Sequence, residues 1–186
     1  KSAFNRGQIL YRIAEMLEGR KQQFVDELIL QGVDKKSATD EVNISIDRLV
    51  YYAGWCDKYT AIFSSVNPIS SSHFNFSIPE AMGVVSIIAP EKQSLLGLIS
   101  VIAPIIAGGN TLVLLASEKM PLSAITFAEV LATSDLPAGV VNILTGTSSE
   151  LFEHFASHMD VNATIYCRNN QNRSEEHTSE LQSLRH

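Results

Sequence analysis

The pattern of hydrophobic positions predicts a β-α-β unit in the middle of the chain. Residues 84–88 form a short, β-branched apolar run that stops before Pro90, and a helix-length apolar stretch follows as far as Gly108. A second strand-like run, residues 111–115, begins soon afterwards. Short apolar runs between turn residues are typical of buried strands, and strands that alternate with helix-length segments indicate a parallel sheet. We therefore expect an α/β fold of a nucleotide-binding type.

Amphipathic helices and short strands are predicted before this unit. Apolar residues three or four positions apart give residues 3–31 one apolar stripe, which indicates one long helix or two, with Gly32 as a stop. The same spacing predicts a helix over residues 38–58. Residues 60–82 are rich in Ser, Asn and Phe and alternate loosely, which favours strands.

The alternation of helices and strands continues after the central unit. Pro121 suits the first turn of a helix, where its missing N–H costs nothing, and Thr147 and Glu150 have the spacing of a capping box. The expected elements are a helix over residues 122–133, a strand over 140–144, a helix over 151–157 and a strand over 163–166.

Composition and charge exclude several classes of protein. The 186 residues are 45 % hydrophobic and 18 % charged, which predicts a globular chain of one domain or one and a half. The net charge is −6 and the basic residues are scattered, so neither nucleic acid nor an anionic membrane is an expected partner. The apolar stretch over residues 95–107 is shorter than the roughly 20 residues that a membrane span needs.

The cysteines and histidines predict no metal site. Cys56 and Cys167 lie far apart, and free thiols in a reducing compartment, the cytoplasm, are the simplest interpretation. Cys56 is expected to be a small packing residue. His154 and His158 are spaced like a metal-binding pair, but no third ligand accompanies them, so a solvated helix face is favoured.

A series of short motifs, in order along residues 1–168, resembles the aldehyde dehydrogenase superfamily. The motifs are Tyr51-Tyr52-Ala53-Gly54-Trp55, Ile102-Ala103-Pro104, Gly109-Asn110-Thr111-Leu112-Val113-Leu114, Ser117-Glu118, Pro121-Leu122 and Leu136-Pro137-Ala138-Gly139-Val140-Val141-Asn142. The resemblance implies a partial Rossmann-like parallel sheet of a cofactor domain, preceded by N-terminal helices and arm strands. It also implies the family reaction, the NAD(P)-dependent oxidation of an aldehyde to a carboxylic acid.

Three departures from the family pattern fall at functional positions. Lys92 stands where the family has the asparagine that stabilises the oxyanion, and loss of such a donor costs about 3 to 4 kcal/mol of transition-state stabilisation. A lysine is a flexible point charge and not a fixed amide dipole. Leu115 replaces a lysine that binds the adenosine ribose, so cofactor affinity should fall. The Phe-Thr-Gly-Ser-like turn that approaches the dinucleotide is absent after Tyr166.

The remaining cofactor-binding candidates follow from the resemblance and lie at predicted strand ends, and the cofactor implied is NAD or NADP. The candidates are Ile88, Ala89, Pro90, Ser117, Glu118 and Gly146. Glu118 can accept hydrogen bonds from ribose hydroxyls, or it can be a solvated carboxylate near a helix start. Gly146, next to a helix N-terminus, can approach a pyrophosphate, although an ordinary β-to-α turn is the simpler interpretation.

The domain organisation is expected to have four parts. Residues 1–58 are the N-terminal helices of the cofactor domain, 59–82 the oligomerisation arm, 83–172 the partial Rossmann-like domain and 173–186 a tail. The tail resembles the translation of a sequencing-library adapter and is expected to be an assembly artefact. The catalytic domain is expected to be absent. Residues 60–82 are expected to contact another aldehyde dehydrogenase unit or a second copy of the chain.

Two functions are compatible with these motifs. The sequence Pro90-Glu91-Lys92 and the motif His158-Met159-Asp160-Val161 most resemble the degenerate second unit of the two-unit aldehyde dehydrogenases, family sixteen. In that case the chain is a non-catalytic scaffold that pairs with an active unit. In the alternative, Lys92 is a tolerated variation in an enzyme whose catalytic cysteine lies in the missing domain.

Overall fold

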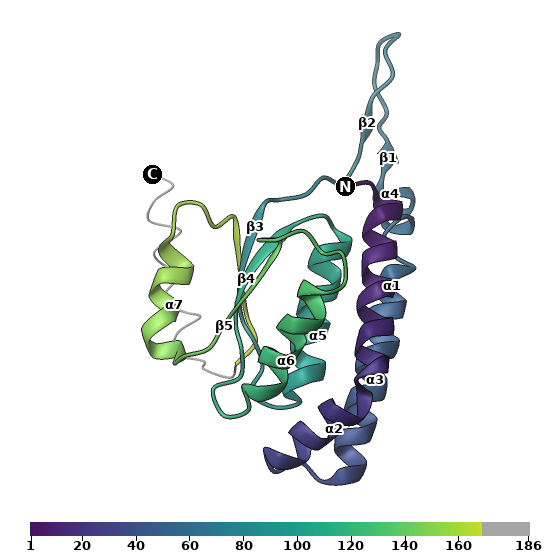
Figure 1. Cartoon of the computed structure of the whole chain (residues 1–186). Helices are drawn as coiled ribbons and strands as arrows, with labels where there is room; N and C mark the ends of the chain where they lie inside the picture. Colours follow the sequence, from purple (N-terminus) through teal and green to yellow (C-terminus); the bar gives the residue numbers. More distant parts are fainter. Residues whose placement is uncertain (169–186) are drawn as a thin grey trace.

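A four-stranded parallel sheet lies at the centre of the computed structural model, which describes residues 1–168 (Figure 1). The predicted tail, residues 173–186, lies outside the described residues. The helices are α1 (Ala3–Gly19), α2 (Lys21–Leu30), α3 (Lys35–Ala53), α4 (Lys58–Phe63), α5 (Ser94–Ala107), α6 (Leu122–Ala132) and α7 (Ser148–Ser157). The strands are β1 (Ser65–Val66), β2 (Phe76–Ser77), β3 (Val84–Ile88), β4 (Thr111–Leu115), β5 (Val141–Leu144) and β6 (Ala163–Tyr166).

The order of the strands in the sheet is β5-β4-β3-β6, and all three pairings are parallel. Ser86 in β3 is paired with Val113 in β4 and with Thr164 in β6. The predicted parallel β-α-β unit is therefore confirmed. The chain moves outward from β3 through β4 to β5 and then returns to the other side of β3. This reversal lies between β3 and β6, and ligands of open α/β sheets bind beyond the carboxyl ends of the strands at such a reversal.

Helices cover both faces of the sheet (Figure 1). One face packs on α5 and α6, and α1 and α3 form a second helical layer over α5. The other face carries α7, whose Phe155 packs with Ile88 and Leu115 in a small separate cluster. The larger core runs without interruption from α1 to α6 and includes the inward side of β3 and β4. The N-terminal helices thus share one hydrophobic core with the sheet.

The N-terminal helices differ in detail from the sequence prediction. Residues 3–31 form two helices that meet at Arg20. The helix predicted over residues 38–58 begins earlier, at Lys35, because the Asp34 carboxylate accepts a hydrogen bond from the Ser37 N–H at 3.0 Å. It also ends earlier, at Ala53, and the separate short helix α4 was not predicted.

The strands β1 and β2 form an antiparallel hairpin that projects away from the rest of the molecule (Figure 1). Its large apolar side chains are exposed, among them Val66, Phe74 and Phe76. Within residues 1–168, no helix combines the length and the apolar character needed to cross a membrane.

Gly83 gives a test of the turn into β3. Its φ is +126°, and a Cβ added there would lie 2.2 Å from Asn162 Oδ1, the atom that accepts a hydrogen bond from the Val84 N–H. We predict that Gly83→Ala lowers the free energy of unfolding by about 2 kcal/mol or more in urea titrations, because strain and a displaced hydrogen bond add. Gly139→Ala is the matched control, since φ is +79° there but nothing lies within 4 Å. An equal loss in both variants would contradict the steric argument.

Candidate functional site

The candidate site is the edge of the sheet at which the carboxyl ends of β3, β4, β5 and β6 meet. Parallel strands place all their carboxyl ends on one side, so residues far apart in sequence lie together there. The structure places all the predicted cofactor-binding residues at this edge. They are Ile88 at the end of β3, Ala89 and Pro90 after it, Ser117 and Glu118 after β4, and Gly146 after β5.

The residues at the end of β3 pack against, or hydrogen-bond to, neighbouring helices and strands. The Ile88 side chain is buried beneath α7, and the Ala89 N–H extends the ladder by donating to the Leu115 carbonyl at 2.9 Å. Pro90 packs on α5 at Gly97, where an added Cβ would lie 3.0 Å from Pro90 Cγ. Leu115, at the position where the family resemblance expects a lysine, is fully buried in the same cluster as Ile88.

Glu91 organises the turn after β4. Its carboxylate accepts a hydrogen bond from Ser117 Oγ at 2.8 Å, and longer ones from the Glu118 and Lys119 N–H groups at 3.4 Å each. Ser117 is buried, and its hydroxyl also accepts from the Met120 N–H at 3.1 Å. The backbone N–H groups of this turn therefore donate to a carboxylate of the chain itself.

Glu118 serves the start of α7. Its Oε1 accepts a hydrogen bond from the Ser148 N–H at 2.7 Å. This backbone hydrogen bond is the main reason that the pKa of Glu118 lies below its ordinary value, and Arg168 adds to the effect. The capping box predicted at Thr147 is wrong, because the Thr147 side chain makes no cap hydrogen bond. A carboxylate 30 positions away caps the helix instead.

Arg168 joins three strand ends through its guanidinium group. Nε donates to the Ala89 carbonyl at 3.0 Å and Nη2 to the Ala116 carbonyl at 3.0 Å. Nη1 forms an ion pair with Glu91 at 2.8 Å and donates to Glu118. The Arg168 side chain is only 9 % exposed. We call Glu91, Glu118 and Arg168 the edge cluster.

Glu41 caps α5 from the other side. It belongs to α3 and is 6 % exposed, and its Oε1 accepts from the Leu95 and Leu96 N–H groups at 2.9 and 3.2 Å. Gln93, the residue before α5, has a left-handed φ of 52° and makes no side-chain cap. The first turn of α5 is thus closed by a buried carboxylate from the N-terminal helices.

Lys92 and Gly146 lie outside these networks. The Lys92 side chain is exposed and, within residues 1–168, takes part in no hydrogen bond or ion pair. A Cβ added at Gly146 would lie 3.4 Å from the Leu151 side chain. The structure therefore gathers Ala89, Ser117 and Glu118 into one network and leaves these two residues beside it.

The described thiols and histidines form no reactive or metal-binding group. Burial raises the pKa of both Cys56 and Cys167, which favours the protonated thiol over the reactive thiolate. Over residues 1–168 no group of three or more His, Cys, Asp or Glu side chains could hold a metal ion.

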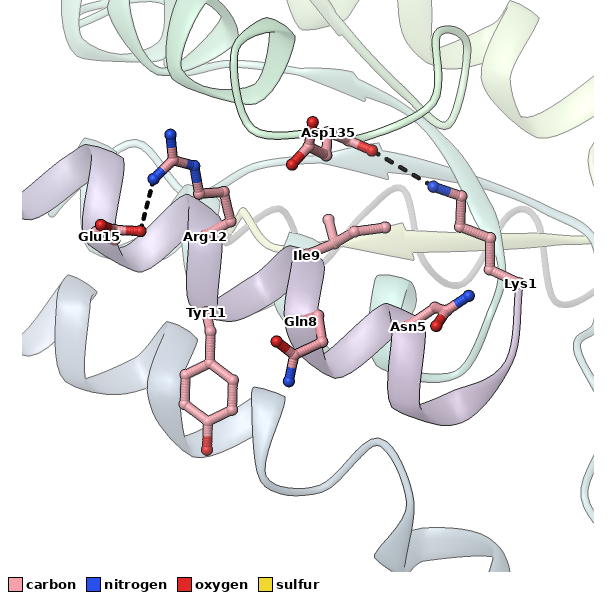
Figure 2. Close-up of a pocket in the computed structure, with 8 residues that line it drawn as sticks. All are labelled: Lys1, Asn5, Gln8, Ile9, Tyr11, Arg12, Glu15 and Asp135. Carbon is pink, nitrogen blue, oxygen red and sulfur yellow. Dashed lines mark hydrogen bonds and ion pairs between the residues drawn. The ribbon is translucent and has the colours of Figure 1, made fainter.

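An open hollow of about 400 Å³ lies elsewhere, between α1 and the turn before β5 (Figure 2). It is lined by Lys1, Asn5, Gln8, Ile9, Tyr11, Arg12, Glu15 and Asp135. Three of its charged side chains bind one another or the backbone, since Arg12 pairs with Glu15 at 2.7 Å and Lys1 donates to the Asp135 carbonyl at 3.5 Å. Asp135 precedes β5, so this hollow lies at the amino edge of the sheet, opposite the edge cluster.

Comparison with known proteins agrees with the fold. Residues 1–166 match the model of the aldehyde dehydrogenase family. The chain belongs to that family. It is 34 % identical over 166 residues to the cytosolic 10-formyltetrahydrofolate dehydrogenase of Homo sapiens and 32 % identical to the mitochondrial protein of that name, covering 86 % of this chain and 18 % of each relative.

Solved aldehyde dehydrogenases superpose closely on this family member. The NAD+ complex of the Bacillus cereus enzyme has a TM-score of 0.90 at 25 % identity, covering 97 % of this chain and 37 % of that one. GapN of Methanocaldococcus jannaschii, a glyceraldehyde-3-phosphate dehydrogenase solved with NADP, has a TM-score of 0.85 at 28 % identity, covering 95 % and 39 %. The chain thus spans less than two fifths of each of these relatives.

The residues at the carboxyl edge do not fit a dinucleotide in the arrangement described. Phosphate groups bind free backbone N–H groups at turns and helix starts. Here the Ser148 N–H is hydrogen-bonded to Glu118, and the Glu118 and Lys119 N–H groups face Glu91. The Arg168 side chain lies across the ends of β3 and β4.

Sequence reasoning missed the two residues that organise this edge. Arg168 and Glu91 lie 77 positions apart by their numbers, and the motif Pro90-Glu91-Lys92 gives no sign that Glu91 pairs with an arginine. The sequence contained only an indirect signal for Arg168. Cys167 and Arg168 stand where the family resemblance predicts a glycine-containing turn, and a large charged side chain in such a turn must find partners nearby.

Glu118 provides a test by pH. A carboxylate whose pKa is lowered on folding stabilises the folded state above its unfolded pKa and loses that effect as the pH falls through the folded pKa. We predict that Glu118→Gln destabilises the protein at pH 7 and that the difference from wild type shrinks as the pH falls through the lowered pKa of Glu118, as measured by urea unfolding. Glu150→Gln, in the first turn of α7 but without such an acceptor role, is the control. A pH-independent difference would contradict the assignment.

Proposed function

We propose that this chain is the cofactor-side part of an aldehyde dehydrogenase unit that does not itself oxidise aldehydes and that pairs with an active unit of the same family. The observation that carries the proposal is Lys92. It follows β3 at the position where the family resemblance expects the oxyanion asparagine, and its ammonium group is exposed and has no hydrogen bond or ion pair with any of residues 1–168. An oxyanion is stabilised by preorganised donors, and a mobile, hydrated cation is not one.

Leu115 supports the same proposal. Its side chain is aliphatic and is buried against Ile88 of the sheet and Phe155 of α7. It therefore offers no hydrogen-bond donor to a ribose at the end of β4. The same role is implied by the resemblance of the sequence motifs to the degenerate second unit of family sixteen. The substrate of the active unit is proposed to be an aldehyde, and the cofactor NAD or NADP.

The alternative function is that of an active enzyme with an unusual oxyanion site. Lys92 could donate a charged hydrogen bond if a catalytic cysteine from another part of the protein faced it. The exposure of its side chain leaves it free to turn toward such a partner. This alternative requires a dinucleotide at the carboxyl edge, where the fit is poor.

Kinetics at position 92 separate the two functions. In the whole protein that contains this chain, we predict that Lys92→Ala and Lys92→Asn leave kcat for aldehyde oxidation unchanged, measured by cofactor reduction with several aldehydes. If the unit were catalytic, restoring the amide would raise kcat, by up to about 100- to 1000-fold. Lys119→Ala is the control, because Lys119 is another exposed lysine at this edge. A change of kcat confined to position 92 would contradict the proposal.

The β1–β2 hairpin is the proposed contact with the partner. Its exposed Val66, Phe74 and Phe76 form an apolar surface on a two-stranded element, and such hairpins are marginally stable alone. The partner is either an active aldehyde dehydrogenase unit or a second copy of the chain. The proposed compartment is the cytoplasm, which agrees with the two free cysteines and with the slightly more similar of the two human relatives, the one named cytosolic.

Substitution in the hairpin tests this contact. We predict that Phe74→Asp with Phe76→Asp shifts the protein to a smaller assembly in light scattering coupled to size exclusion, because burying two carboxylates in an apolar interface costs several kcal/mol. Met159→Asp is the control, since Met159 is also apolar and, at 95 % exposure, even more accessible than Phe74 and Phe76, but it lies in the turn after α7. An unchanged mass for the hairpin variant would rule out this surface.

A further inference from the structure

Three carboxylates of the chain occupy the backbone donors of the carboxyl edge. Glu41 accepts from the first turn of α5, Glu91 faces the turn after β4, and Glu118 accepts from the start of α7. Each of these segments follows a strand and points its N–H groups at the edge of the sheet. Such groups attract anions through their hydrogen bonds and through the helix dipole.

The carboxylates are fixed in these positions. Glu41 is buried and accepts two hydrogen bonds from backbone N–H groups, which offset its loss of hydration. Glu91 and Glu118 share the Arg168 guanidinium, whose other nitrogens donate to the carbonyls after β3 and β4. The Arg168 cation is almost fully buried, so losing either carboxylate would leave it with one charged partner fewer. Each of the three side chains therefore holds the other two in place.

We infer that this unit is closed to dinucleotides by its own side chains: Glu91 and Glu118 stand in for the anionic groups of a ligand, and Arg168 locks them across three strand ends. A dinucleotide diphosphate is itself an anion. It would have to displace carboxylates that already hold the N–H groups and that are held in turn by ion pairs with Arg168. The backbone donors of the site are therefore already filled.

This inference deepens the proposed function. It rests on the proposed function only because it takes this unit to be degenerate. Its test measures binding, whereas the test at Lys92 measures turnover. A unit that binds NAD without oxidising aldehydes would overturn the inference and leave the proposed function standing. A change of kcat at position 92 would overturn the proposed function, whatever the binding result.

The test uses the whole protein that contains this chain, with NAD+ and NADP+ as probes. Hydrogen–deuterium exchange at the amides of Glu118, Lys119 and Ser148, with and without each probe, assigns binding to this edge and not to another unit. For the wild type we expect no change of exchange at these amides. Slower exchange in the presence of micromolar NAD+ or NADP+ would overturn the inference without any variant.

The double variant Glu91→Ala/Arg168→Ala removes one charge of each sign. It frees the Glu118 and Lys119 N–H groups and leaves Glu118 as an acceptor. We expect NAD+ or NADP+ to slow exchange at these amides in this variant, with affinity at least about tenfold above wild type, a factor worth about 1.4 kcal/mol. The control Arg20→Ala/Glu129→Ala deletes an equally charge-neutral ion pair, with an N–O distance of 2.7 Å, on the helical layers and should bind as wild type does.

Folding of the double variant is checked by circular dichroism. A folded double variant that still excludes both cofactors would overturn the assignment to the edge cluster. If the double variant does not fold, Arg168→Lys gives the second reading, because a lysine keeps the charge but cannot bridge two carbonyls and two carboxylates. A gain of binding in Arg168→Lys supports the inference, and continued exclusion overturns the role of Arg168 as the lock.

Discussion

The burial of β3 and β4 on both faces is the constraint on which the rest of the structure depends. Side chains alternate along a strand, so Ile87 and Leu114 pack toward α5 while Ile88 and Leu115 pack toward α7. Two strands that are apolar on both faces need a layer of helices on each side, and the connections that supply these layers make the strands parallel. Parallel strands then bring all their carboxyl ends to one edge, which positions the candidate site.

What the carboxyl edge of the sheet can bind depends on the acceptors that its backbone N–H groups already have. Strand-to-helix turns leave N–H groups without helical partners, and these must be satisfied by water, by a ligand or by the chain. Here the chain supplies carboxylates from α3 and from two turns. The same geometry that binds an anionic cofactor in other proteins can therefore be used to hold an internal acidic side chain, at no change in backbone fold.

The comparison with solved relatives illustrates how separate the fold and the site are. A TM-score of 0.90 at 25 % identity to the NAD+ complex of the Bacillus cereus enzyme shows that the backbone is conserved through extensive substitution. Core positions tolerate exchange among apolar residues of similar volume. A site depends on single donors and charges, so a single arginine at a strand end, such as Arg168, alters the site without altering the fold.

The sequence by itself determined the elements and the class of fold. Apolar runs bounded by Pro90, Gly108 and Gly109 predicted β3, α5 and β4, because burial and turn chemistry act over a few neighbouring residues. The motifs along residues 1–168 gave the family and directed attention to the strand ends. Helix limits that depend on local caps, such as the start of α3 after the cap residue Asp34, were predicted within a few residues.

Only the tertiary structure decided what those strand ends do. The partners of Arg168 lie 50 to 79 positions away along the chain, and the carboxylate that caps α5 is 54 positions from it. Contacts of this kind form where the sheet brings separate turns together, and no local pattern encodes them. Hydrophobic periodicity reports which face of an element is buried, whereas the pairing of charges depends on which elements become neighbours once that burial is complete.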